Sequence, residues 1–130
     1  MKSGVPAIQI GTVDVRDVAD AHIRGAFLDD ASGRHIVFKD VVSFLDLALM
    51  LSDKFDAGYS LPKKELPKWL VWLIGPLVDK TFSRKMISRN FGHPWHADNS
   101  KSVSALGLSY TSLKSSMEEM FQQMINQKRF

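Results

Sequence analysis

Apolar and polar residues alternate over residues 8–15, and the pattern then changes to helical spacing. The alternation predicts a strand, and apolar or small residues three and four apart predict a helix over Asp17–Leu28. The mostly small residues on one face of this helix favour close packing on a sheet. They are Val18, Ala21, His22, Gly25 and Ala26. Asp17, in the expected first turn, is interpreted as a helix-start residue rather than a catalytic acid.

The next two elements follow after a polar turn. Arg34–Phe38 is a short apolar run bounded by Gly33, which predicts a second strand, parallel to the first and reached by a right-handed crossover. Ser43 and Asp46 have the spacing of a capping box at the start of a helix that continues to Phe55. Because that helix is apolar nearly all round, we expect it to be covered on two sides.

Three further helical patterns and one short helix complete the chain. A third helix is expected from near Glu65, stopped or kinked at Gly75-Pro76, and a fourth over Phe82–Phe91. A short helix should end at Gly107, and the last helix should start at Thr111 or Ser112. The expected inward residues of the third helix are Leu66, Trp69, Leu70, Leu73 and Ile74. Those of the fourth are Phe82, Met86 and Ile87, with Arg84, Lys85 and Arg89 outward.

Composition limits the class of protein. At 130 residues the chain is one domain or part of one, and it contains no cysteine. A disulfide framework and cysteine-ligated zinc are therefore excluded, and a reducing, cytoplasmic setting is expected. The N-terminus lacks the apolar segment of a secretory signal. The longest apolar block, Trp69–Val78, has ten residues, whereas a membrane-spanning helix needs about 20.

The net charge of +3 is unevenly placed. Residues 1–56 carry six Lys and Arg against nine acids, whereas residues 57–101 carry eight against three. Such a basic middle is either a solvated face or a surface for an anionic partner. No arginine and aromatic motif of a nucleic-acid-binding module accompanies it, so nucleic acid is not an expected partner.

Candidate catalytic and metal-binding groups are sparse. His22 lies in mid-helix with no second ligand one turn away, so it is interpreted as a structural histidine. His93, His96 and Asp98 have a spacing that could ligate zinc, but no glutamate base or regular helix accompanies them, and no metal site is predicted. The serines lie outside any G-x-S-x-G turn. The glycines are isolated, so no G-x-G-x-x-G or G-K-S/T phosphate cradle occurs.

Several segments, in order, resemble one enzyme family. Thr12–His22, with the residues TVDVRDVADAH, looks like a segment of the extended short-chain dehydrogenase/reductases, and most like the dihydroflavonol-reductase-like branch of the NAD-dependent epimerase/dehydratase family. Similar correspondences are Gly33–Ile36, Leu61–Val71 with Gly75-Pro76, and Asp98–Lys101 followed by Leu106–Leu108. The resemblance implies an α/β fold, namely the C-terminal part of an NAD(P)-binding extended short-chain dehydrogenase fold, mostly helical with two or three short strands. Residues 1–130 would then be a single incomplete domain without its nucleotide-binding half.

The family's N-terminal half carries G-x-x-G-x-x-G, a serine and a Tyr-x-x-x-Lys pair, none of which is recognised in this chain. Tyr59 with Lys63 and Tyr110 with Lys114 have the pair's spacing, but both are interpreted as coincidences. No catalytic or cofactor-binding residue is therefore carried over, and NAD(P) is implied only for the full-length parent. The resemblance implies a role in lining a pocket for a carbonyl or hydroxyl substrate. The residues favoured by their chemistry for that role are Phe82, Met86, Arg89, Trp95 and His96.

The sequence thus predicts a substrate-binding segment of an oxidoreductase or epimerase that is inactive alone. Its partner would be the missing nucleotide-binding half, or a second copy joined through open strand edges. One alternative is a stand-alone interaction module that uses the basic, tryptophan-containing region around Lys63–Lys85 on a membrane or an acidic partner. Another is a small enzyme with a site built from His93, His96 and Asp98.

Overall fold

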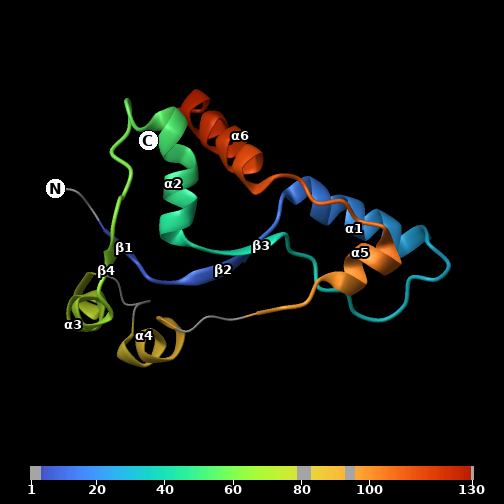
Figure 1. The fold of residues 1–130 in the computed structure, drawn as a ribbon, viewed down its shortest axis with the longest axis horizontal. Helices are drawn as coiled ribbons and strands as arrows, with labels where there is room; N and C mark the ends of the chain where they lie inside the picture. The colour runs from blue at the N-terminus through green and yellow to red at the C-terminus, as the bar shows by residue number, and fades with distance from the viewer. Residues whose placement is uncertain (1–3, 79–82, 93–95, 130) are drawn as a thin grey trace. The chain divides into compact units, whose positions relative to one another are not determined.

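The computed structural model describes residues 4–78, 83–92 and 96–129 (Figure 1). These residues are mostly helical, as predicted, with four short strands in place of the expected two or three. The elements, in chain order, are β1 (Val5–Pro6), β2 (Gln9–Thr12), α1 (Val15–Phe27), β3 (Asp40–Ser43), α2 (Phe44–Phe55), β4 (Glu65–Leu66), α3 (Lys68–Val78), α4 (Arg84–Asn90), α5 (Ser100–Leu106) and α6 (Leu113–Asn126).

The chain forms two compact units. The first comprises Met1–Ile10 and Val42–Trp95, and the second comprises Gly11–Val41 and His96–Phe130. Each unit is therefore built from two separate stretches of sequence, and the strands β2 and β3 each contain a boundary between the units.

In the first unit, β1 and β4 form a parallel pair with Val5 opposite Glu65 and Pro6 opposite Leu66. The helix α2 begins with the predicted capping box. The backbone N–H of Asp46 donates to Ser43 Oγ at 3.1 Å, and the backbone N–H of Ser43 donates to Asp46 Oδ2 at 2.9 Å. Two of the free donors at this helix start are thereby satisfied, which fixes where the helix begins.

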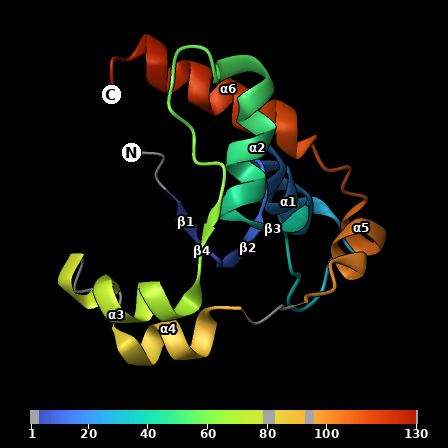
Figure 2. The ribbon, with the colours of Figure 1, turned by 60° about the vertical axis from the view of Figure 1, so that its left-hand side comes forward.

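The helices α3 and α4 of the first unit lie side by side (Figure 1 and Figure 2). Val71 of α3 packs with Ile87 and with Phe91, the residue after α4, and the last two are fully buried. The helix α3 runs through Gly75 and Pro76 to Val78, so the proline does not stop it. A proline removes one hydrogen bond from a helix, because it has no N–H, and its ring clashes with the preceding turn. Near the end of α3, packing against α4 can offset the free-energy cost of these two effects.

In the second unit, α1 is capped by Asp14, whose carboxylate accepts from the backbone N–H of Arg16 at 2.8 Å. The core of this unit is formed by Ala21, Leu106 and Leu108. Gly107 ends α5 in the left-handed conformation, with φ of 63°, as the sequence predicted. The last helix, α6, starts after Ser112, as predicted, and buries Leu113 and Phe121.

The predicted strand at Arg34–Phe38 is wrong, because the strand β3 begins two residues later. Two backbone carbonyls of this segment, and that of Ser32 just before it, instead accept hydrogen bonds from side chains of residues 99 and 101. Lys101 Nζ donates to the carbonyls of Ser32 at 2.8 Å and of Arg34 at 3.3 Å, and Asn99 Nδ2 donates to that of Phe38 at 2.7 Å. These bonds replace a strand ladder.

The predicted parallel pairing with a crossover is also wrong for β2 and β3. Backbone hydrogen bonds join Lys39 to Thr12 and Phe44 to Ile8, so one strand rises in residue number as the other falls. The pair is therefore antiparallel.

The buried face of α1 differs from the expected one. Ala21 is buried, but His22, Gly25 and Ala26 are exposed. The buried side instead carries Asp17 and Ala21, because polar side chains of α1 bond to the segment that follows α5.

Within the described ranges, none of the helices combines the length and the apolar character needed to cross a membrane.

Candidate functional site

The α3–α4 hairpin carries two of the residues proposed from the sequence to contact a substrate. Lys68, the first residue of α3, holds the hairpin together: its Nζ donates to the backbone carbonyls of Ser88 at 3.2 Å and Phe91 at 2.8 Å. These carbonyls lie at the C-terminal end of α4, where the helix dipole favours a positive charge. A single lysine therefore fixes the start of one helix to the end of the other.

The predicted substrate-contacting residues have different surroundings. Met86 is half-buried against the cluster of Val71, Ile87 and Phe91, whereas Arg89, one turn further along α4, is exposed. His96 is exposed and belongs to the second unit. Phe82 and Trp95 lie outside the described residues. The structure thus places Met86 and Arg89 on the same short helix, and their contact with a substrate stays a prediction.

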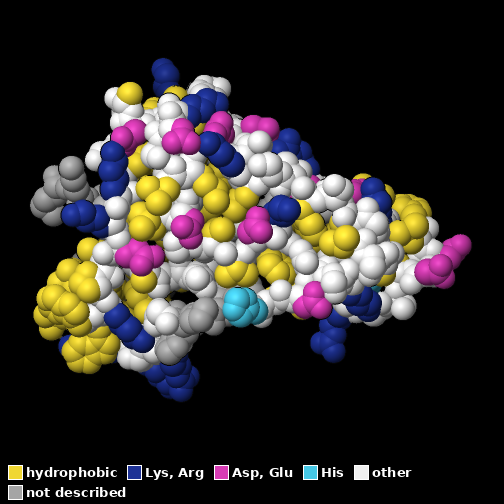
Figure 3. Space-filling model, in the orientation of Figure 1, with side chains coloured by type: hydrophobic (Ala, Val, Ile, Leu, Met, Phe, Trp, Pro, Cys, Tyr) yellow, Lys and Arg dark blue, Asp and Glu magenta, His cyan; other side chains and the backbone are white. Residues whose placement is uncertain are grey.

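The outer face of α3 is apolar and uncovered, contrary to the expectation that it would be inward. Trp69 is 67% exposed, Leu73 52% and Leu77 86%. In Figure 3 hydrophobic side chains gather over α3, with Lys and Arg beside them. Arg84 of α4 lies over the ring of Trp72, 4.7 Å from its centroid. Sequence periodicity missed this face because α3 is apolar on nearly every side, so the spacing could not tell which side packs on α4.

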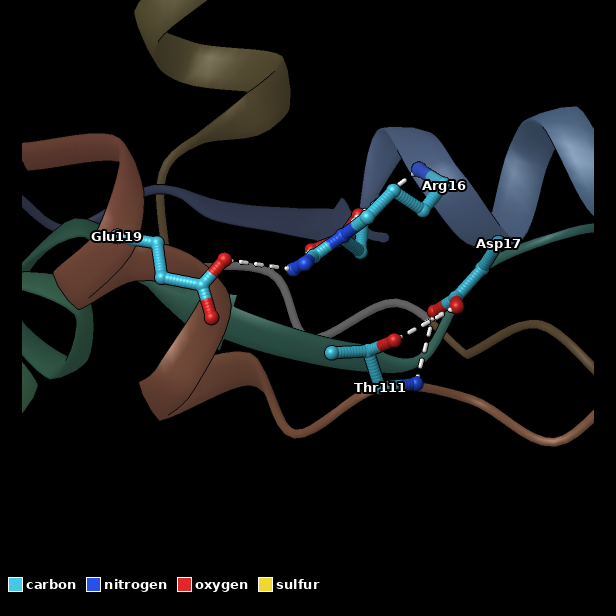
Figure 4. Close-up of polar contacts among 5 residues, drawn as sticks. Arg16, Asp17, Thr111 and Glu119 are labelled. Atoms are coloured by element: carbon cyan, nitrogen blue, oxygen red, sulfur yellow. Dashed lines mark hydrogen bonds and ion pairs between the residues drawn. The ribbon is translucent and has the colours of Figure 1, made fainter. Parts of the chain in front are cut away.

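A second cluster of polar groups lies at the start of α1 (Figure 4). The guanidinium of Arg16 donates to the carboxylate of Asp14 at 2.9 and 2.7 Å, and it also pairs with Glu119 of α6 at 3.0 Å. Asp14 is buried, and the hydrogen bonds from Arg16 and then Ser116 hold the pKa of Asp14 well below its usual range. A carboxylate held ionised in this way is suited to structure, since it has no proton to exchange near neutral pH.

Asp17 joins α1 to the segment before α6. Its carboxylate accepts from the backbone N–H and from the hydroxyl of Thr111, both at 2.8 Å. Asp17 therefore does more than start a helix, because it also binds a residue outside α1. Sequence reasoning missed its partner, which lies 94 residues away in the chain.

The segments that resemble the reductase family contact one another in the second unit. Lys101 and Asn99 bind the carbonyls of residues 32–38, and Arg24 donates to the carbonyls of Leu106 at 3.2 Å and Gly107 at 3.0 Å. The hydroxyl of Ser102 donates to the Asn99 carbonyl, which leaves it to accept from the hydroxyl of Tyr110 at 2.8 Å. Each of these groups has a structural partner.

One residue of each Tyr-x-x-x-Lys spacing has a polar partner elsewhere. The hydroxyl of Tyr110 bonds to that of Ser102, and Lys63 forms an ion pair with Asp56 at 2.5 Å. The interpretation of both spacings as coincidences stays a prediction.

Two of the histidines, His22 and His35, line one depression of the second unit. His22 Nδ1 lies 2.7 Å from the carbonyl of Val18, in its own helix. His35 Nε2 is buried without a hydrogen-bond partner in the described part of the chain, and both histidines line a shallow depression of about 460 Å³. The carboxylate of Asp98 accepts from Ser100, whose backbone N–H and then hydroxyl lower the pKa of Asp98. The described residues contain no cluster of three metal-ligating side chains, and His93 lies outside them.

Comparison with known proteins places this geometry in a known fold. No protein-family model and no curated protein matches the chain. Gre2 from Candida albicans in complex with NADPH matches with a TM-score of 0.66 and 28% identity, over 95% of this chain and 32% of Gre2. Yeast methylglyoxal/isovaleraldehyde reductase Gre2 complexed with NADPH matches with a TM-score of 0.69 and 21% identity, over 99% of this chain and 37% of the reductase.

The chain therefore spans about a third of the length of these reductases and has the fold of that part of them. The predicted fold class is confirmed. Both neighbours are NADPH complexes, and the yeast protein is a methylglyoxal/isovaleraldehyde reductase.

Proposed function

We propose that this chain is the C-terminal, substrate-binding portion of an NAD(P)-dependent reductase of the extended short-chain dehydrogenase/reductase class, in its dihydroflavonol-reductase-like branch. The observation that carries the proposal is the match to NADPH-bound Gre2 over 95% of this chain but only 32% of Gre2. The sequence signals of nucleotide binding, which the family carries in its other half, are not found here.

Surfaces left open in the structure support a missing partner. Gly25 has no atom within 4 Å of the position that a Cβ would take, and His22 and Ala26 beside it are exposed, so α1 is uncovered at this point. In the described ranges, β1 pairs only with β4 and β2 only with β3. A parallel pair such as β1 and β4 is usually covered on both faces in α/β proteins. The nucleotide-binding half would supply further strands and helices for these surfaces.

The role proposed for this chain is to hold a small carbonyl or hydroxyl substrate against the cofactor. Arg89 is exposed on α4 and offers planar donors to a substrate oxygen, and Met86 beside it offers an adaptable apolar contact. Phe82, Trp95 and His96 complete the set proposed from the sequence. Positioning of this kind gives no rate enhancement without the groups that transfer hydride and proton, so the chain alone should not turn over.

A chimera tests the proposal. The matched third of yeast Gre2 is replaced by this chain, and NADPH oxidation with isovaleraldehyde is followed by absorbance for the chimera, yeast Gre2 and the chain alone. We expect turnover by the chimera and none by the chain alone. Turnover by the chain alone would overturn the proposal, as would a chimera that folds and binds NADPH but reduces none of a panel of aldehydes and ketones.

The DNA upstream of the codon for Met1 gives an independent check. We expect the reading frame to continue upstream and to encode a glycine-rich fingerprint followed by a Tyr-x-x-x-Lys pair. An in-frame stop codon there, with no neighbouring gene that encodes such a half, contradicts the proposal.

Without the other half, the open strand edges should pair between copies of the chain. We therefore expect self-association that increases with concentration, measured by light scattering after size-exclusion chromatography. A monomer at every concentration would count against open edges as association sites.

A further inference from the structure

The exposed apolar residues of α3 form one continuous stripe. Trp69, Trp72, Leu73 and Leu77 follow one another at helical spacing, and Ile74 lies beside them, 38% exposed. Residues separated by three or four positions lie on the same side of a helix. Single exposed apolar residues are ordinary on protein surfaces, but two tryptophans and three large aliphatic residues on one helix are not.

The hairpin does not need this stripe for its own core. That core consists of Val71, Ile87 and Phe91 on the opposite side, and Ile87 and Phe91 have no exposed surface. Lys68 closes the hairpin with two hydrogen bonds to backbone carbonyls. The stripe is therefore available on a structure that is already packed.

Positive charge lies at one edge of the stripe, where Arg84 of α4 stacks on Trp72. Lys85 and Arg89 are exposed elsewhere on the same helix. Residues 63–97 contain seven Lys and Arg and two acids. Tryptophan and arginine or lysine around an aliphatic face are the composition of a helix that lies in the headgroup region of a bilayer.

We propose that the α3–α4 hairpin binds the surface of membranes that contain anionic lipids. The stripe of α3 enters the headgroup region, Arg84 at its edge faces lipid phosphates and carboxylates, and Lys85 and Arg89 add positive charge on the same helix. A second copy of the chain is a poorer occupant, because a symmetric contact would bring the same cations against each other. The proposal is independent of the function proposed above, since it concerns a surface and no step of catalysis.

The test uses the full chain and vesicles of phosphatidylcholine with and without phosphatidylserine. We expect cosedimentation and a blue shift of tryptophan emission with the anionic vesicles only. Leu73→Ser with Leu77→Ser should weaken binding by about tenfold or more, because apolar burial in the bilayer is lost. Arg84→Gln with Lys85→Gln should weaken binding about thirtyfold, at about fivefold per charge near an anionic surface.

Matched controls come from the second unit. Ile23→Ser with Phe27→Ser removes two apolar residues that are 59% and 82% exposed on α1, and Arg34→Gln with Arg129→Gln removes two charges. We expect both control pairs to bind as the unmodified chain does. Circular dichroism and thermal unfolding verify that each variant is folded.

Several results would overturn the proposal. One is equal binding of the chain to neutral and to anionic vesicles. Another is a loss of binding in the α1 control variant as large as that in the α3 variant. A third is binding to polyglutamate without binding to anionic vesicles, which identifies an acidic protein as the partner. A dimer that dissociates only in the Leu73→Ser and Leu77→Ser variant identifies a second copy as the occupant of the stripe and also overturns it.

Discussion

The carboxylate of Asp17 accepts two hydrogen bonds from Thr111, from its backbone N–H and its hydroxyl, both at 2.8 Å, across 94 residues of sequence. This contact sets the orientation of α1 within the second unit. It also explains why the apolar face expected from the sequence of α1 is not the face that is buried. A buried carboxylate with two donors constrains a helix more strongly than a few small residues do.

Removing that carboxylate should destabilise the second unit. We expect Asp17→Ala to lower the free energy of unfolding by about 1–3 kcal/mol, because it leaves the Thr111 donors unsatisfied. Urea unfolding followed by circular dichroism measures the change. The control is Asp20→Ala, which removes an exposed ion pair with Arg24 and should cost about 0.5 kcal/mol. Equal effects of the two substitutions would mean that the Asp17–Thr111 contact stabilises the second unit no more than an exposed ion pair does.

Stability should fall in acid because of Asp14. Its pKa is lowered in the folded chain by hydrogen bonds from Arg16, so the unfolded chain binds a proton more readily than the folded one. The stabilisation is therefore fully present above about pH 4, the ordinary range of an aspartate, and is lost as the pH falls below it. Unfolding free energies measured from neutral to acidic pH should show this loss, and Asp14→Asn should reduce the slope. An unchanged slope in Asp14→Asn would contradict the assignment.

The capping box of α2 should contribute measurably to the first unit. We expect Ser43→Ala to cost about 1 kcal/mol, because the N–H of Asp46 loses its acceptor. Ser52→Ala is a matched control in the same helix: Ser52 Oγ bonds back to the Leu49 carbonyl, and its loss should be neutral or slightly stabilising. Thermal unfolding of both variants distinguishes a cap from an ordinary serine.

The hairpin should open partially when Lys68 is neutralised. Lys68→Met keeps the aliphatic stem but removes the charge from the C-terminal carbonyls of α4, and we expect a loss of about 1 kcal/mol. Lys64→Met is the control, because Lys64 is exposed and, among the described contacts, it acts through its backbone carbonyl, which accepts from the N–H of Val5. Hydrogen exchange of the α4 amides should quicken in the first variant and not in the second.

Local signals predicted much of the secondary structure. The capping box at Ser43, the helix end at Gly107 and the start of α6 after Ser112 are each recognised by neighbours within a few residues, and the structure confirms all three. The role of the substrate-contacting residues depends on groups far apart in the chain. Met86 and Arg89 lie on α4, and their contact with a substrate stays a prediction.

The sequence by itself determined where most helices begin and end, the basic character of residues 57–101, and the resemblance to a reductase, because these depend on residues close together in the chain. Only the tertiary structure decided that Arg34–Phe38 is no strand, that α1 turns Asp17 inward, and that α3 presents Trp69 and Leu77 outward. The reason is physical. A carbonyl bonded by a distant Lys101, or a helix apolar on all sides, carries no local sign of which partner or which face the fold will use.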